Sequence, residues 1–413
     1  MKLILFVKTF NSIKSEIIKS PKKNVVFLEG GFGVISTHCY SLPFIFNKKN
    51  TQVFWLVKSN FNPQEMIDLW QKRVDVSSIN IFKVNFNFFN FNSKKILIFL
   101  WKKIAKISNK NFYDIYDFDI LFIKKYGIKK FELLERKNKN FHQEGYNFHN
   151  EKNIKKYHIF RSPFLSQIVK NEKSSEPLLK YNKGIEKKYF YLKSLKKVFF
   201  MLYVRKRNVP SLEGVARNGS GLINYLSTIK FLNKKGYVPL INGDFSKKDI
   251  SILKKRKALF FDSSKLKLSD ILFYQLSNRI SKFVISEYGG GTCLPFTLKK
   301  RMLLLNFFPI SNGYPNSLIF PKIYIKKKKS FKNIEELFQK KAFNEFIKNN
   351  EFRELDSKEI CEASKEFYYE FLYKTKIYRN KVTRINSNFS SYLKTSKYSE
   401  TYIKIQSKEL SKK

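Results

Sequence analysis

Turn-forming residues, cysteine and long apolar runs are all scarce in this chain of 413 residues. With 15 glycines and 11 prolines, the sequence has too few turn residues to predict an all-β fold. Its 3 cysteines show neither metal-site spacing nor a disulfide framework, so we expect a reducing, cytoplasmic environment. The best candidate for a membrane span, residues 96–107, is interrupted by Lys102 and Lys103, and the first ten residues have too short an apolar core for a signal peptide.

Acidic residues are scarce as well, because 33 Asp and Glu stand against 81 Lys and Arg, which gives a net charge of +48. Such a charge is typical of proteins that bind nucleic acid or anionic membranes. The lysines are spread through every segment, however, and no zinc finger, RRM or KH motif is present. The joint excess of Lys, Asn, Ile and Phe is also what an AT-rich genome produces. We therefore expect no nucleic-acid partner, and a basic nucleic-acid-binding protein stands as the alternative function.

The chain does contain a regular alternation of apolar strands and amphipathic helices. In its first half we predict strands over residues 24–29, 51–57 and 78–86, with helices after the glycine-rich turn at 30–33 and over 62–73. In its second half we predict strands over 197–205, 237–244, 258–264, 282–289 and 301–309, and intervening helices over 220–236, 247–257, 269–279 and 291–300. Continuous apolar strands of this kind are typical of a parallel sheet buried on both faces. The sequence therefore predicts the α/β class.

The domain organisation follows from composition. A polar segment over residues 171–184 is typical of a linker. We predict an N-terminal domain over residues 1–175, a second domain over 176–350, and C-terminal helices with a ragged basic tail over 351–413. Residues 332–350 and 357–376 each have a helical pattern.

Three consecutive glycines, Gly289, Gly290 and Gly291, stand between the strand that contains Ser286 and a helix that begins near Thr292. In open α/β sheets, ligands bind beyond the carboxyl ends of the strands. Backbone N–H groups at the start of a helix attract phosphate, and the missing Cβ lets an anion approach the backbone. We predict a phosphate-binding loop here, with a tight turn that needs glycine for packing alone as the alternative.

Two further segments at strand ends add candidate ligand-binding residues. Arg205 ends a predicted strand, where a guanidinium can clamp a diphosphate with two parallel hydrogen bonds. Arg217 and Asn218 lie just before the next helix, and Gly243 with Asp244 follows the next strand. In so basic a chain, a solvated loop is the alternative explanation for the cations.

The second half resembles a known enzyme family. The resemblance lies in the ordered motifs YVRKRN, ARNGSGLINYLSTIKFLNKKGYVPLINGD, SDILFYQLSNRISKFVISEYGGGTCLPFTLKKRMLLLNFFP and PKIYIKK, over about residues 195–328, with a fainter echo at EGGFGVISTH. It is a resemblance to bacterial glycosyltransferases of surface-polysaccharide and lipopolysaccharide clusters. These GT-B-like proteins are distantly similar to fucosyltransferases and heptosyltransferases. The resemblance implies two stacked Rossmann-like domains, with the nucleotide-sugar bound mainly by the C-terminal one.

The resemblance also implies residue roles. Arg205 would meet the donor diphosphate, while Ser286 and residues 289–292 would cradle phosphate or ribose. Asn306 and Pro309 would shape the loop after the last predicted strand. The chain departs from the family pattern where Glu287 and Tyr288 replace small residues before the glycines, and where Ile241 and Asn242 stand in place of a basic residue.

A catalytic base is expected on the acceptor-side domain. His38 lies about one helical turn after the loop that contains Gly30, Gly31 and Gly33, and Glu29 directly precedes that loop. Either side chain can take the proton of an acceptor hydroxyl, and a packed or surface role is the alternative for both. No DxD-like metal motif is present, so we expect a metal-independent reaction without a cofactor, in which the nucleotide-sugar is a co-substrate.

Together these features predict a glycosyltransferase that moves a sugar from a nucleotide-sugar donor to a cell-surface glycan or its lipid-linked precursor. We expect it in the cytoplasm, with peripheral contact at the anionic inner face of the membrane. A catalytically inactive GT-B-like module that binds nucleotide-sugar or glycan is a second alternative beside the nucleic-acid-binding protein.

Overall fold

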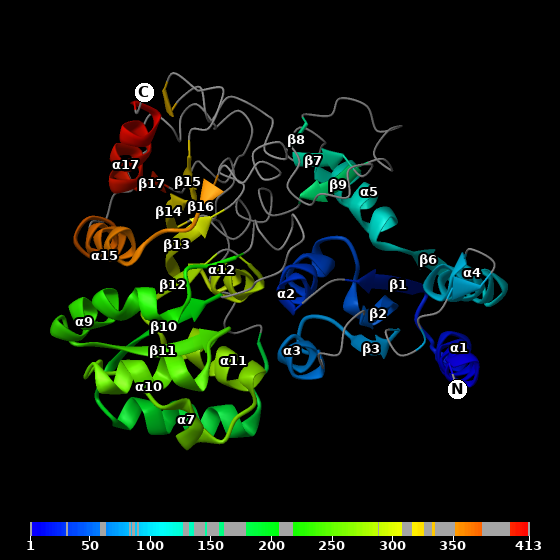
Figure 1. Cartoon of the computed structure of the whole chain (residues 1–413). Coiled ribbons are helices and arrows are strands. Elements are labelled where there is room, and N and C mark those ends of the chain that lie inside the picture. Colours follow the sequence, from blue (N-terminus) through cyan, green and yellow to red (C-terminus); the bar gives the residue numbers. More distant parts are fainter. Residues whose placement is uncertain are drawn as a thin grey trace. The chain divides into compact units, whose positions relative to one another are not determined.

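The computed structural model describes residues 2–29, 32–57, 63–81, 84, 87–88, 91–126, 132–135, 145–146, 157–160, 179–205, 218–287, 289–307, 316–325, 333–334, 352–373 and 397–411. The chain divides into two compact units. Unit 1 comprises residues 1–127 and 176–182, and unit 2 comprises residues 128–175 and 183–413. Figure 1 shows the helices and strands of both units. Each unit has its own parallel sheet, so the predicted α/β class is confirmed.

The sheet of unit 1 has four parallel strands in the order β3-β2-β1-β6. Its strands are β1 (Asn24–Glu29), β2 (Thr51–Val57), β3 (Val76–Asn80) and β6 (Asn111–Tyr113). The strands predicted over 24–29 and 51–57 are confirmed, and the third lies a little earlier than predicted. Because the chain runs outward from β1 to β3 and then returns to the other side of β1, the order reverses between β1 and β6. This reversal is the topological switch point, where open sheets bind ligands.

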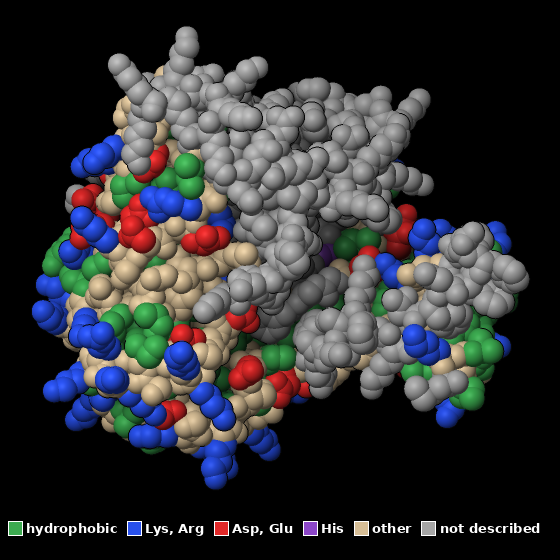
Figure 2. Space-filling model, in the orientation of Figure 1, with side chains coloured by type: hydrophobic (Ala, Val, Ile, Leu, Met, Phe, Trp, Pro, Cys, Tyr) green, Lys and Arg blue, Asp and Glu red, His purple; other side chains and the backbone are tan. Residues whose placement is uncertain are grey.

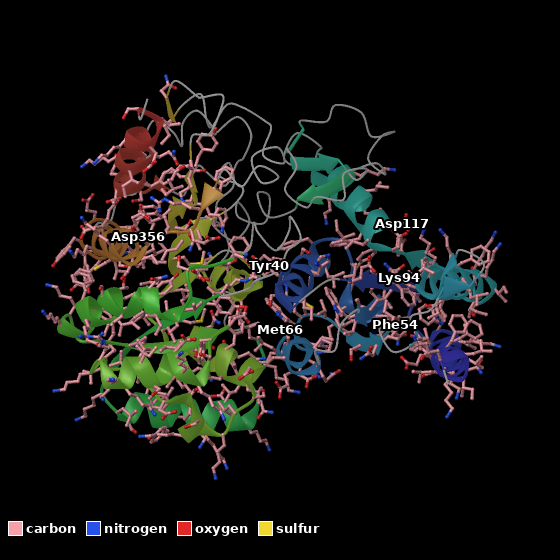
Figure 3. The ribbon with its side chains drawn as sticks, in the orientation of Figure 1. Tyr40, Phe54, Met66, Lys94, Asp117 and Asp356 are labelled. Atoms are coloured by element: carbon pink, nitrogen blue, oxygen red, sulfur yellow. The ribbon has the colours of Figure 1, made fainter. Side chains whose placement is uncertain are left out.

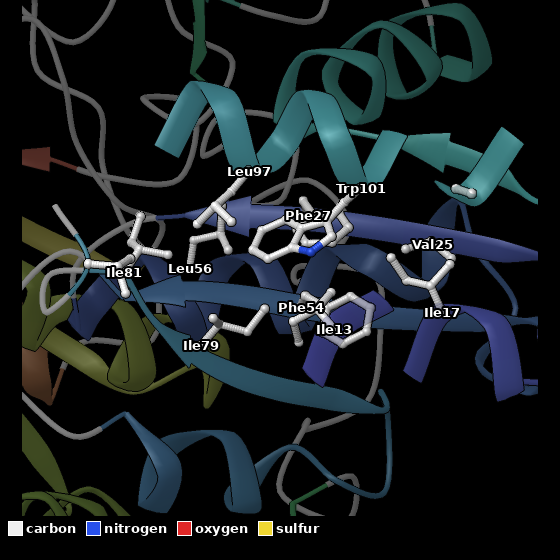
Figure 4. Packing of buried hydrophobic residues seen from close by; sticks show 12 residues of the cluster. Ile13, Ile17, Val25, Phe27, Phe54, Leu56, Ile79, Ile81, Leu97 and Trp101 are labelled. Carbon is white, nitrogen blue, oxygen red and sulfur yellow. The ribbon is translucent and has the colours of Figure 1, made fainter. Parts of the chain in front are cut away.

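Helices cover both faces of this sheet. They are α1 (Lys2–Lys19), α2 (Phe32–Ser41), α3 (Gln64–Leu69), α4 (Ser93–Ile107) and α5 (Ile115–Tyr126). Figure 4 shows how α1 and α4 pack on one face, where Phe27 of β1 stacks on Phe54 and Trp101 with ring centroids 5.0 Å apart. Neither helix was predicted, because the apolar runs in both segments resemble a leader or a membrane span.

The sheet of unit 2 has six parallel strands in the order β11-β10-β12-β13-β14-β17. Its strands are β10 (Val198–Val204), β11 (Tyr237–Gly243), β12 (Phe283–Glu287), β13 (Arg301–Phe307), β14 (Ser317–Pro321) and β17 (Lys397–Tyr398). The chain leaves β10 for β11 on one side and later returns to β12 on the other. The switch point of unit 2 therefore lies between β10 and β12.

Most helices of unit 2 follow the predicted pattern, but the first and the last of them were not predicted. They are α7 (Lys183–Ser194), α9 (Leu226–Lys234), α10 (Lys247–Lys255), α11 (Asp270–Ile280), α12 (Cys293–Thr297), α15 (Ser357–Glu366), which continues as a π-helical segment over Phe367–Leu372, and α17 (Glu400–Ser411). In Figure 1, α9 packs against α15 and α7 packs against α11. Gly236, with φ +83°, stops α9 as predicted. The helix predicted over 332–350 lies outside the described residues except for 333–334.

Short antiparallel pairs complete the described strands. They are β4 (Asn87–Phe88) with β5 (Phe91–Asn92), β7 (Glu132–Glu135) with β8 (Gly145–Tyr146) and β9 (Tyr157–Phe160), and β15 (Ile323–Tyr324) with β16 (Phe352–Arg353). None of the described helices is long and apolar enough to cross a membrane.

The strand predicted over residues 258–264 is wrong. These residues form no strand, and the Phe261 N–H makes a single ladder-like bond, 3.1 Å long, to the Pro239 carbonyl of β11. Pro239 has no N–H, so β11 cannot complete a ladder on both sides and stands at the sheet edge.

The prediction of a ragged C-terminal tail is also wrong for residues 397–411. β17 extends the sheet beside β14, and α17 is fixed to β15 by Gln406. The Gln406 amide accepts from the Tyr324 N–H at 2.8 Å and donates to the Tyr324 carbonyl at 3.0 Å. A single glutamine thus satisfies both backbone groups of one residue, a pairing that helical periodicity does not reveal.

Candidate functional site

Arg205 and Gly289 lie against one another at the switch point of unit 2. Arg205 follows β10 directly, and Gly289 follows β12 after one intervening residue. A Cβ on Gly289 would lie 2.1 Å from Nη1 of Arg205, so the buried guanidinium occupies the space that any other residue at 289 would need. The first member of the glycine triplet is therefore glycine because it lets Arg205 pack against the backbone of this loop.

The last glycine of the triplet serves packing. A Cβ on Gly291 would lie 2.4 Å from the ring of Tyr203, and the Tyr274 hydroxyl donates a 2.9 Å hydrogen bond to the Gly291 carbonyl. Residues 290–292 form one 3-10 turn that leads into α12, the short helix predicted here. The packing explanation therefore holds for Gly291, whereas Gly289 adjoins a cation.

The hydroxyls predicted to meet phosphate have backbone partners instead. Ser286 donates to the carbonyl of Glu287 at 3.0 Å, and Thr292 donates to the carbonyl of Gly289 at 2.7 Å. Both residues are fully buried. A phosphate oxygen only accepts hydrogen bonds, so in this arrangement the two hydroxyl protons are committed to the turn itself.

Glu287 is the centre of a buried hydrogen-bond network. Its carboxylate accepts from the backbone N–H of Arg205, from the N–H of Ser220 at 2.6 Å and from Nδ2 of Asn306 at 3.0 Å. Burial raises the pKa of the Glu287 carboxyl, and these donors oppose that rise. The acidic residue that departs from the family pattern therefore holds the end of β10 to residues 218–220. Tyr288 lies outside the described residues.

Asn306 connects this network to the C-terminal part of the chain. Its backbone has φ +50°, its amide donates to Ser220 Oγ at 2.9 Å, and its Oδ1 accepts from the N–H of Leu355 at 2.8 Å. Ser220 in turn donates to the Leu355 carbonyl at 2.6 Å. Helical structure begins at Leu222, two residues after the predicted start, and the Ser220 hydroxyl bonds a distant segment instead of capping the helix.

Lys322 is a site residue that the sequence analysis did not single out. It is buried directly after β14, and Nζ donates to the carbonyl of Asn218 at 2.8 Å and to the carboxylate of Glu354 at 2.7 Å. Burial lowers the pKa of Lys322, Glu354 opposes this shift, and the charge of Arg205 adds to it. Two buried cations thus lie at the carboxyl ends of this sheet. The signal was available, since Lys322 interrupts the apolar run IFPKIYI.

The predicted loop of Gly243 and Asp244, which follows β11, contacts the end of β10. Gly243 has φ +103°, and a Cβ there would lie 2.0 Å from the carbonyl oxygen of Val204. The N–H of Asp244 donates to the same carbonyl at 2.8 Å. This contact holds the end of β11 to the residue that precedes Arg205. Four residues with a predicted role lie outside the described part of the chain, namely Gly30, Gly31, Arg217 and Pro309.

The candidate catalytic residues belong to unit 1. Glu29 ends β1, keeps 22% of its side chain exposed and forms an ion pair with Lys94, which Figure 3 labels on α4. His38 is buried in α2, where its ring meets Trp55 edge-on with centroids 5.5 Å apart. Gly33 is buried in the first turn of the same helix. Of the two predicted bases, Glu29 is thus the more accessible.

No protein-family model and no curated protein matches the sequence. Among solved structures, similarity is found to a family 9 glycosyltransferase from Veillonella parvula DSM 2008, with 10% identity, 84% of this chain and 98% of that chain covered, and a TM-score of 0.46. The Escherichia coli ADP-heptose lipopolysaccharide heptosyltransferase II shares 9% identity over 79% of this chain and 97% of that one, with a TM-score of 0.39. A UDP-GlcNAc 2-epimerase from Neisseria meningitidis, bound to UDP-GlcNAc, shares 11% over 93% and 97%, with a TM-score of 0.39. These proteins include transferases and an epimerase at TM-scores below 0.5, so the similarity selects no activity.

Proposed function

We propose that the chain is a glycosyltransferase that moves a sugar from a nucleotide-sugar donor to a cell-surface glycan or its lipid-linked precursor. The observation that carries the proposal is the contact of the Arg205 guanidinium with Gly289 at the β10–β12 switch point. Ligands of open parallel sheets bind at such a point, and a guanidinium there favours an anionic group. The class of reaction comes from the order of the motifs around these residues, which resembles that of bacterial surface-polysaccharide glycosyltransferases.

In the proposed reaction, an acceptor hydroxyl attacks the anomeric carbon of the donor sugar. The bond from this carbon to the diphosphate oxygen breaks, the new glycosidic bond forms, and the hydroxyl proton passes to a base. Arg205 and Lys322 stabilise the negative charge that develops on the leaving nucleoside diphosphate. Glu287 fixes the backbone of Arg205 and so acts as a positioning residue. We propose Glu29 as the base, because its carboxylate is partly exposed at the end of β1.

We propose that this chemistry needs neither a metal ion nor a cofactor. Two buried cations supply the positive charge that a metal ion otherwise supplies to a diphosphate. Among the described residues, no three His, Cys, Asp or Glu side chains are grouped closely enough to hold a metal ion. The proposed partners are therefore the nucleotide-sugar and the glycan acceptor, and a cytoplasmic location gives access to both.

A thermal-shift screen of the full chain with UDP, GDP, CDP, ADP and a single-stranded oligonucleotide at physiological salt tests the donor site. We expect one nucleoside diphosphate to raise the melting temperature, because it binds only the native state. Arg205→Ala should weaken its affinity at least about 30-fold, as expected on removal of a buried charged partner. Arg256→Ala, at the exposed end of α10, is the matched control and should leave the shift unchanged. Stabilisation by the oligonucleotide alone would overturn the proposal.

Glu29 is tested separately with the donor whose nucleotide gives that shift. Glu29→Gln should reduce sugar transfer about 100-fold or more, the usual contribution of a general base, while leaving the nucleotide-induced shift as it is. Normal transfer by Glu29→Gln would remove Glu29 as the base and leave the donor site untouched. An absence of donor turnover in a wild-type chain that binds the nucleotide would favour the inactive nucleotide-sugar-binding module.

A further inference from the structure

The outer faces of α1 and α4 expose an unusual amount of apolar surface. The two helices lie side by side over one face of the unit 1 sheet, with Ile13, Leu97 and Trp101 among their buried residues. Their opposite faces carry six large exposed apolar side chains, which are Leu3 (65%), Ile4 (62%), Val7 (46%), Ile18 (51%), Phe99 (58%) and Ile107 (82%). We call these residues, with the exposed lysines of both helices, the α1–α4 surface. A cluster of this kind on two adjoining elements marks a binding face rather than scattered exposure.

The same surface is strongly basic. α1 contains four lysines and one glutamate, and α4 contains five lysines and no acidic residue. On α4, the exposed Lys95, Lys102, Lys103 and Lys106 share one face with Phe99, because residues three and four apart are neighbours on a helix. The Nζ of Lys103 lies 5.5 Å from the centre of the Phe99 ring. In Figure 2, green apolar and blue basic side chains adjoin in the part of the molecule that carries α1 and α4 in Figure 1.

Lysine and aliphatic side chains in this mixture fit one kind of partner. A basic amphipathic helix lies in the interface of an anionic membrane, where its aliphatic groups enter the acyl boundary and its lysines meet lipid phosphates. Lysine stems cover apolar surface while their ammonium groups stay at headgroup level. Neither helix contains Arg, the residue that most often reads bases, and Phe99 is the one large aromatic side chain exposed on them.

Unit 2 provides a contrast in a basic helix that has no exposed apolar face. The helix α10 also exposes four lysines, Lys247, Lys248, Lys254 and Lys255. No large hydrophobic side chain of α10 is exposed in the way that Ile4 and Phe99 are. α4 and α10 thus expose the same number of lysines, and the exposed apolar side chains distinguish α4 from α10.

We propose that the α1–α4 surface is a docking site for an anionic lipid bilayer, in which both helices lie along the membrane interface. The lysines supply attraction to the negative lipid headgroups, and Leu3, Ile4, Val7 and Phe99 supply insertion. This proposal stands on unit 1 alone and does not depend on the glycosyltransferase reaction.

Vesicle flotation of the full chain at physiological salt tests the proposal. Wild-type protein should float with phosphatidylcholine vesicles that contain phosphatidylglycerol, and should not float with phosphatidylcholine alone. Lys102→Glu/Lys103→Glu should weaken binding at least about tenfold, since each lysine near the surface contributes about fivefold. The matched control, Lys247→Glu/Lys248→Glu on α10, changes the net charge equally and should change binding less than about twofold.

A second variant tests insertion without changing the charge. Leu3→Ser/Ile4→Ser/Val7→Ser alters only exposed side chains, so the chain should keep its melting temperature and lose about tenfold or more in vesicle affinity. Equal losses with the α10 control would overturn the proposal in favour of general charge attraction. Failure of the wild type to float would also overturn it. Loss of self-association or of oligonucleotide binding in the α1 and α4 variants, with flotation unchanged, would assign the surface to a second copy or to nucleic acid.

Discussion

The two parallel sheets of this chain each have a topological switch point, but the polar residues at the two points differ. At the β1–β6 switch point of unit 1, Glu29 ends β1 in an ion pair with Lys94. Asp114 and Asp117 follow β6, and each carboxylate accepts from the backbone N–H of the other residue, at 3.0 and 3.1 Å. At the β10–β12 switch point of unit 2, Arg205 and Glu287 belong to a continuous buried hydrogen-bond network. Topology provides the position of a switch point in both units, and under the proposed function the polar network of unit 2 is what would prepare that position for an anion.

The buried charges of that network require desolvation on folding, and this free-energy penalty is the reason to connect the network with function. Buried charged groups contribute little net stability, because desolvation offsets most of their attraction, and an apolar replacement is often as stable. Lys322 and Glu287 are both buried. Burial lowers the pKa of Lys322 and raises that of Glu287, so it favours the neutral form of each side chain. In unit 1, by contrast, β1 ends with Glu29 in a partly exposed ion pair with Lys94. The polar centre of unit 2 is thus better explained by a ligand than by folding.

The largest expected effect comes from disturbing the packing of the network. Gly219→Ala would place a Cβ 1.9 Å from the Glu287 carboxylate and 2.2 Å from the backbone oxygen of Arg205. Because backbone must move to relieve this clash, we expect the free energy of unfolding to fall by about 3 kcal/mol or more. The control Gly236→Ala adds strain at φ +83° with nothing within 4 Å, and should cost only about 1–2 kcal/mol. Urea unfolding measures both, and equal costs would contradict the tight packing around Glu287.

Glu287→Gln should have the next largest effect. The amide nitrogen would face a backbone N–H that now meets a carboxylate oxygen, so we expect a loss of about 1–3 kcal/mol in unfolding free energy at neutral pH. Glu362→Gln, which alters an exposed carboxylate paired with Lys365, is the control and should change stability by less than about 0.5 kcal/mol.

The same variant gives a pH dependence with a defined sign. Burial raises the Glu287 pKa in the folded state, so its protonation stabilises the fold fully below the unfolded value near 4.5 and this contribution is lost as pH rises through the raised pKa. Glu287→Gln has no titratable group at this position and so lacks this pH-dependent contribution to stability. The wild type should therefore lose part of its advantage in unfolding free energy over the variant as pH rises through this range. Urea unfolding of both proteins at several pH values measures this difference. A gap that widens would mean that the carboxylate form is favoured by the fold.

The sequence predicted β10–β13 and α9–α12 of unit 2 because strand and helix periodicity are local signals. Residues 301–309, for example, form an apolar run that becomes β13, and Gly236 stops α9 where its position indicates. The contacts of Ser220 and Asn306 with Leu355 could not be predicted in the same way. They join residues 135 and 49 positions apart in sequence, and no periodicity encodes such a pairing. The π-helical continuation of α15 was likewise invisible to a search for helical spacing.

The site was predicted to the extent that it depends on strand ends. Arg205 and Gly289 follow strands that the sequence marks clearly, and the parallel topology brings these ends together. The sequence marked Glu287 only as a departure from a family pattern. Its role depends on three hydrogen-bond donors from separate segments of the chain, which no local pattern reveals. Lys322 was missed because the basic composition made one more lysine uninformative, although its apolar flanks distinguished it.

In unit 1, a substitution of His38 should have a modest effect. His38→Phe keeps an aromatic ring against Trp55 and Phe118, so we expect a loss of about 1 kcal/mol in unfolding free energy and an unchanged rate of sugar transfer. A drop of about 100-fold in transfer, with the melting temperature preserved, would instead assign the base to His38 rather than to Glu29. In that case unit 1, like unit 2 with Arg205 and Lys322, would have a buried polar side chain with a role in the reaction.

The smallest expected effect is that of a chelator. If Arg205 and Lys322 supply the positive charge for the donor diphosphate, EDTA should leave both the nucleotide-induced thermal shift and sugar transfer unchanged, and added Mg²⁺ should not increase either. The measurement is the thermal shift at saturating nucleotide, with Arg205→Ala as the variant in which the cation is already missing. A shift that depends on Mg²⁺ in the wild type would mean that the two buried cations are insufficient alone. In that case Mg²⁺ would neutralise the diphosphate, and Arg205 and Lys322 would only orient it. Unit 2 would then differ from unit 1 in how it orients a ligand, not in the positive charge that it supplies.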